Sequence, residues 1–115
     1  MKNMRDRIPV CRHGSIESID PVLVTSLEEL EHNLGDELTF SSGYRCKVCN
    51  AAAGGVKNSA HIRGKAVDIL VDNSGERFWL VYNAVKLGFK RIGVGRNFVH
   101  LDVDYDLPNH VLWLY

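Results

Sequence analysis

The sequence lacks an excess of charge of either sign, because its 14 Lys and Arg residues balance its 14 Asp and Glu residues. Nucleic-acid-binding domains usually carry a broad basic surface, so this balance argues against a nucleic-acid partner. A local basic patch is the one form of nucleic-acid-binding surface that the balance leaves open. The chain also lacks a run of roughly 20 apolar residues, the length that a membrane-spanning helix needs. Repeats and low-complexity tracts are absent too. We therefore expect 115 residues to form one domain, with residues 1–18 as an N-terminal arm.

The N-terminus lacks the apolar segment of a secretory signal, since the chain opens with the charged stretch MKNMRDRIPV. We therefore expect the protein to be cytoplasmic as synthesised. Cysteine is scarce, and the three cysteines are an odd number. An odd, small number argues against a disulfide framework and leaves metal ligands or free thiols.

Hydrophobic periodicity predicts helices and strands in an order typical of an α+β fold. One long helix is expected between Asp20 as N-cap and Gly35, and another between Ser74 as N-cap and Gly88. A short helix is expected over 46–55. Strands are expected over 37–45, 65–71, 91–95, 98–104 and 110–115. These elements predict a mainly antiparallel sheet with packed helices.

Two histidines and one carboxylate stand in apolar or glycine-rich surroundings. His61 precedes Asp68 in the stretch NSAHIRGKAVDI, and His100 lies in the middle of the apolar segment NFVHLDV. A lone histidine on a strand is usually a structural residue, and that interpretation stays open here. Two nitrogens and one oxygen also form a common ligand set of catalytic zinc, which keeps a fourth position open to water.

The stretch SAHIRGKAVD resembles the S-x-H-x-x-G-x-A-x-D motif of the zinc D-Ala-D-Ala carboxypeptidase and murein endopeptidase family. The segments SGYRCKVCNAAAGGVKNSAH and GVGRNFVHLDV are also similar to that family, including its short phage-encoded members. The resemblance runs from about Ile19 to the C-terminus. It implies the fold of the hedgehog signalling domain and one Zn²⁺ ion on His61, Asp68 and His100. It also implies hydrolysis of peptidoglycan peptides by a D,D-carboxypeptidase or cross-link endopeptidase. A phage endolysin or virion protein that reaches the cell wall after release would fit.

The resemblance implies roles for the residues around the motif. Arg45 would grip the carboxylate of the substrate or polarise its carbonyl, since a guanidinium fork suits both tasks, although a surface salt bridge is the alternative. Ser59 would bind substrate or orient a ligand, unless it is a simple turn residue. Gly64 and Ala66 would keep the space beside the metal clear.

One position departs from the family pattern. Active members carry Asp or Glu three residues before the last zinc histidine as the general base, and this chain has Asn97 there. An amide cannot take up that proton. The nearest carboxylate is Asp102, which would serve either as the base or as a partner that holds His100. The alternative function is a zinc-containing module that binds cell-wall peptide or a protein partner without hydrolysis.

A second ligand set lies outside the motif. Its members are two pairs of closely spaced metal-binding residues: Cys11 and His13, and Cys46 and Cys49. The C-x-x-C spacing is typical of zinc sites, so a second, structural zinc is one interpretation. A disulfide or buried thiols that pack as small apolar groups are the alternatives.

Overall fold

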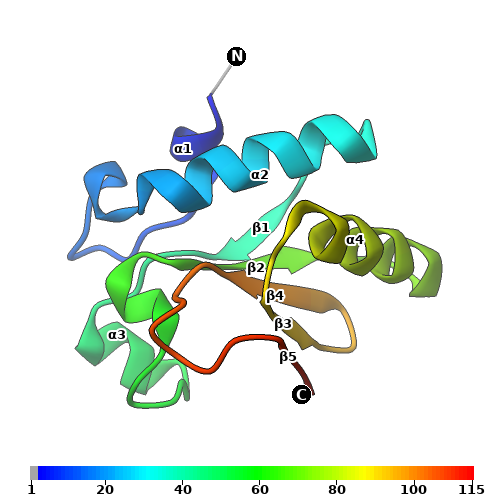
Figure 1. Cartoon of the computed structure of the whole chain (residues 1–115). Coiled ribbons are helices and arrows are strands. Elements are labelled where there is room, and N and C mark those ends of the chain that lie inside the picture. Colours follow the sequence, from blue (N-terminus) through cyan, green and yellow to red (C-terminus); the bar gives the residue numbers. More distant parts are fainter. Residues whose placement is uncertain (1–2) are drawn as a thin grey trace.

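Five strands form one sheet in the order β1-β2-β4-β3-β5 in this computed structural model, which describes residues 3–115 (Figure 1). The strands, in chain order from β1 to β5, are Phe40–Ser42, Ala66–Leu70, Arg91–Val94, Phe98–Asp102 and Val111–Leu114. Neighbouring strands run antiparallel except β3 and β5, which are parallel. The predicted α+β fold with a mainly antiparallel sheet is therefore confirmed.

Two long helices, α2 (Pro21–Leu34) and α4 (Ser74–Leu87), pack across one face of the sheet (Figure 1). Their apolar side chains meet the strand residues that alternate toward that face, which removes both sets from water. The fully or nearly fully buried contributors from the helices and from β2 and β4 are Leu23, Leu27, Leu30, Leu80, Ala84, Val67, Ile69, Val99 and Leu101. Because this core uses one face of β2 and β4, the other face is left for polar side chains.

The ends of both long helices follow from their capping residues. The carboxylate of Asp20 accepts a hydrogen bond from the N–H of Val22 at 2.7 Å, and Gly35 ends α2 in the left-handed region at φ 69°. The predicted N-cap of α4 is wrong by one residue. Asn73 takes that position, because its side-chain oxygen reaches the N–H of Glu76 at 2.8 Å.

The remaining helices are short: α1 (Met4–Arg7), η1 (Ile16–Ser18), α3 (Lys47–Ala52) and η2 (Ala60–Arg63). The sequence patterns predict α3 but not the other three, because one turn is too short to show periodicity. The strand predicted over 37–45 shrinks to β1, whose register shifts between Phe40 and Ser42. Within residues 3–115, every helix falls short of the length and apolarity that crossing a membrane would demand.

The N-terminal arm is docked on α2. Met4 and Ile8 are buried in the core, and the guanidinium of Arg7 forms two hydrogen bonds, of 2.9 and 2.6 Å, with the carboxylate of Glu31. The same carboxylate accepts from the N–H of Leu38 at 2.8 Å. The arm is thus held both by apolar burial and by a bidentate ion pair.

We expect Glu31→Gln to lower the free energy of unfolding by about 1–2 kcal/mol, because it weakens a partly buried bidentate pair. The hydrogen bond from Arg7 holds the pKa of Glu31 below its ordinary value. The stabilisation is therefore complete above the unfolded-state pKa of about 4.3 and is lost as pH falls through the lower folded-state pKa. Urea unfolding at several pH values would measure both effects.

Glu37→Gln is the matched control for this pair. Glu37 also faces Arg7, at 3.8 Å, but its side chain is 79% exposed. We expect its substitution to change the free energy of unfolding by less than about 0.5 kcal/mol. An equal decrease in the free energy of unfolding in the two variants would show that the bidentate geometry at Glu31 adds nothing to stability.

Candidate metal centre

The sheet brings the two histidines and the carboxylate of the sequence motif together. Asp68 on β2 and His100 on β4 are direct cross-strand neighbours, and His61 approaches from η2. Nε2 of His61 and Nδ1 of His100 lie 3.4 and 3.2 Å from the same oxygen, Oδ1 of Asp68. Zinc bonds of about 2.0–2.1 Å to nitrogen and oxygen, at a tetrahedral angle, would place such atoms roughly 3.3 Å apart. The spacing therefore fits one zinc ion.

The other nitrogen of each histidine has a fixed acceptor. Nδ1 of His61 lies 2.7 Å from the carbonyl oxygen of Gly43, and Nε2 of His100 lies 2.7 Å from Oδ2 of Asp102. Each acceptor takes an N–H and leaves the lone pair of the opposite nitrogen facing Asp68. Two lone pairs and a carboxylate oxygen then converge, so protons or a cation must lie between them.

The electrostatics of the centre follow from this convergence. Burial alone would raise the pKa of Asp68, but its hydrogen bonds to His100 and His61 outweigh burial and hold that pKa well below its ordinary value. Burial would lower the pKa of His100, but its hydrogen bonds to Asp102 and Asp68 raise the pKa above its ordinary value. Zinc and protons compete for the same lone pairs, so metal binding here would release protons.

Asp102 is buried behind His100 rather than open to the centre. It is 0% exposed, and its Oδ1 accepts from Nε of Arg91 at 2.8 Å and from the N–H of Asp104 at 3.1 Å. Its Oδ2 faces His100. Both carboxylate oxygens are thus engaged. Of the two roles predicted for Asp102, this geometry favours the partner of His100 over the general base.

A cavity of about 610 Å³ opens at the centre. Besides the three proposed ligands, it is lined by Arg45, Ser59, Trp113 and Tyr115, among others. Nε of Arg45 is buried and has no hydrogen-bond partner among the described residues. Ser59 accepts the N–H of His61 through its hydroxyl at 3.2 Å, as the N-cap of η2. Ser59 therefore helps to place His61.

Two contacts at the centre were not predicted from the sequence. Gly93 pairs with His100 on one side and with Trp113 on the other. A Cβ atom at Gly93 would lie only 2.6 Å from Nε1 of Trp113, so the missing side chain lets the indole approach, and its ring centroid lies 5.2 Å from that of His100. A glycine inside a strand is the one sequence signal for such close packing.

The role predicted for Gly64 needs correction. Gly64 ends η2 in the left-handed region at φ 69°, and a Cβ atom there would lie 1.7 Å from the carbonyl oxygen of Ser18. Its lack of a side chain accommodates the backbone of residue 18 rather than a metal. Ala66 is fully buried and pairs across the sheet with Asp102. Asn97 is exposed in the turn before β4 and is not among the residues that line the cavity.

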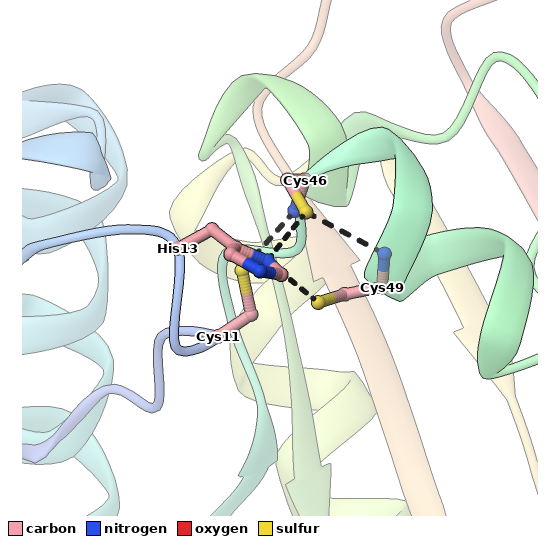
Figure 2. Close-up of side chains that lie close together, drawn as sticks. All are labelled: Cys11, His13, Cys46 and Cys49. Carbon is pink, nitrogen blue, oxygen red and sulfur yellow. Dashed lines mark hydrogen bonds between the residues drawn. The ribbon is translucent and has the colours of Figure 1, made fainter.

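The second predicted ligand set also comes together. Ligand atoms of Cys11, His13, Cys46 and Cys49 all lie within 4.8 Å of one another (Figure 2). The set shares no residue with the group of His61, Asp68 and His100, which we call the histidine–aspartate centre. Residues 3–115 therefore hold two separate groups with metal-ligand chemistry.

Comparison with known proteins gives results that agree with one another. The family described as Peptidase M15 matches residues 2–102 of the chain. The zinc D-Ala-D-Ala carboxypeptidase of Streptomyces albus G is 34% identical over 55 residues, which cover 47% of this chain and 22% of that protein. The probable peptidoglycan L,D-endopeptidase MepK of Haemophilus influenzae is 32% identical over 111 residues, covering 86% of this chain and 56% of that protein. The chain thus spans about half or less of the length of these relatives.

Proposed function

The chain belongs to the peptidase M15 family, and from that premise we propose that it is a zinc-dependent peptidase of bacterial peptidoglycan, either a D,D-carboxypeptidase or a cross-link endopeptidase. The observation that carries the proposal is the convergence of His61, Asp68 and His100 at a cavity. A three-ligand set of this kind leaves a coordination position for water, as catalytic zinc requires. The names of the two relatives agree with this substrate class.

The zinc ion and the residues around it would have separate roles in hydrolysis. Zinc would supply a hydroxide at neutral pH by lowering the pKa of its bound water to about 7. The guanidinium of Arg45, a residue that lines the cavity, would hold the carboxylate or the carbonyl oxygen of the substrate. Gly43 and Asp102 would keep the two histidines oriented through the rest of the cycle.

One observation favours a second candidate function. Among the described residues, the carboxylates that line the cavity are Asp68 and Asp102. Asp68 is itself a proposed zinc ligand, and both oxygens of Asp102 are engaged by Arg91 and His100, so neither suits the role of general base. General-base help typically contributes about 10²- to 10⁴-fold to the rate. A module that binds cell-wall peptide without cleaving it is therefore the alternative.

Zinc-loaded protein should be incubated with purified peptidoglycan and with defined peptides that end in D-Ala-D-Ala or contain L,D and D,D cross-links. We expect release of D-Ala or of uncross-linked peptides, loss of that activity in a chelator, and its return with zinc. The product identifies the scissile bond. Peptide binding with zinc present and no cleavage of any substrate would support the binding module instead.

Arg45→Lys is expected to lower kcat/KM by roughly 10- to 100-fold, because lysine keeps the charge but loses the bidentate fork. Zinc content and the thermal unfolding midpoint should stay at wild-type values. Arg96→Lys, at an exposed position outside the cavity, is the matched control. Unchanged kinetics in Arg45→Lys would remove Arg45 from substrate binding.

A further inference from the structure

Three thiols and one imidazole converge where the N-terminal arm meets the start of α3 (Figure 2). Cys11 and His13 lie on the arm, Cys46 is the N-cap residue of α3, and Cys49 lies in its first turn. We call these four residues the cysteine–histidine cluster. Its two halves are more than 30 residues apart in the chain, so the fold itself assembles them.

The distances in the cluster match those of a tetrahedral metal site. Nδ1 of His13 lies 3.3 Å from Sγ of Cys46 and 3.4 Å from Sγ of Cys49. Zinc bonds of about 2.3 Å to sulfur and about 2.0 Å to nitrogen, at a tetrahedral angle, would place these atoms roughly 3.5 Å apart. The backbone N–H of Cys46 faces Sγ of Cys11 at 3.4 Å. A backbone N–H that donates to a metal-bound side chain helps to hold that ligand in place.

We infer that one structural zinc ion binds to the four members of the cluster: Cys11, His13, Cys46 and Cys49. Four protein ligands complete the tetrahedral coordination and leave no position for water, which is the arrangement of structural zinc. Three thiolates favour zinc over magnesium or calcium, which prefer oxygen ligands. The ion ties the arm to α3.

A disulfide explains less of this geometry. A disulfide joins two sulfurs and gives no role to the third thiol or to His13, whose Nδ1 faces two sulfurs at once. Packing as small apolar groups also fits poorly, because the three cysteines are only partly buried and His13 is exposed. A metal ion uses all four side chains.

The cluster adjoins the backbone that holds His61. Cys46 directly follows Arg45, whose N–H donates to the carbonyl oxygen of His61 at 3.1 Å. On the arm side, the N–H of Cys11 donates to the carbonyl oxygen of Tyr44 at 3.0 Å. Zinc in the cluster thus fixes residues 43–46, and with them the support of the histidine–aspartate centre. This last effect rests on the proposed function, whereas metal binding by the cluster does not.

Cobalt substitution of the purified full-length protein tests the ligand type. Thiolate–cobalt bonds absorb strongly in the near ultraviolet by charge transfer, whereas histidine and carboxylate ligands do not. We expect this band in the wild type and in His61→Ala/His100→Ala, and its loss in Cys46→Ser/Cys49→Ser. A cobalt-loaded wild type without the band would overturn the inference. That measurement needs no substitution, so a serine variant that does not fold leaves the test intact.

Zinc analysis and thiol counting provide independent readouts. We expect two zinc ions per wild-type chain and one in Cys46→Ser/Cys49→Ser, whereas His32→Ala, at an exposed histidine on α2, should keep both. After denaturation in a chelator without reductant, all three cysteines should react with a thiol reagent. One reactive thiol per chain would show a disulfide and overturn the inference. Two bound zinc ions without hydrolysis would count against the proposed function alone.

Discussion

The double substitution His61→Ala/His100→Ala should remove one zinc ion per chain and reduce hydrolysis of peptidoglycan peptides below detection. The two imidazoles supply both nitrogens of the proposed three-ligand centre, and Asp68 alone cannot hold zinc against water. Without the ion, no hydroxide forms at neutral pH. Metal analysis and product analysis on the same preparation would measure both losses.

His32→Ala and His110→Asn are the controls for this double variant. Both histidines are exposed and lie outside the two ligand sets, and asparagine at residue 110 tolerates its positive φ of 59°. These controls should keep the wild-type zinc content and hydrolysis. If the double variant keeps the wild-type zinc content, the centre is not a zinc site.

The elements around the centre could be predicted because their local signals agree with the fold. Asp20, Pro21 and Gly35 fix the ends of α2, and alternating apolar residues fix β2 and β4. Alternation also places His100 and Asp102 on one face of β4, as the structure shows. Periodicity could not assign the register of the sheet, which sets Asp68 opposite His100.

There is a physical reason why contacts between distant segments could not be predicted from the sequence. The carbonyl oxygen of Gly43 that fixes His61 belongs to the backbone, so no side-chain pattern marks it. Trp113 reaches His100 across Gly93 only because β5 pairs in parallel with β3, a pairing that the sequence does not specify. The motif predicts that Gly64 keeps the space beside the metal clear, whereas the atom closest to a Cβ built at Gly64 is the carbonyl oxygen of Ser18 in the arm.

Asp102→Asn separates the two roles that the sequence leaves open for this carboxylate. As the buried partner of His100, Asp102 fixes the ring and increases its basicity, so its loss should weaken zinc binding by about 10- to 100-fold. At saturating zinc, hydrolysis should largely return. As a general base, its loss would leave zinc affinity unchanged and lower kcat by about 10²- to 10⁴-fold.

Asp104→Asn is the matched control, because Asp104 is also a buried aspartate paired with an arginine, Arg63, but does not touch His100. Both substitutions break an ion pair of a buried aspartate, so both should lower the free energy of unfolding. The loss should be about 3–5 kcal/mol for Asp102, whose partner Arg91 is 12% exposed, and smaller for Asp104, whose partner Arg63 is 36% exposed. Only Asp102→Asn should shift the zinc dissociation constant, measured by competition with a chromophoric chelator at a temperature where both variants stay folded. An equal shift in both variants would mean that lost stability, rather than the orientation of His100, weakens the centre. Unchanged zinc affinity with lost hydrolysis would instead make Asp102 the base, despite its burial.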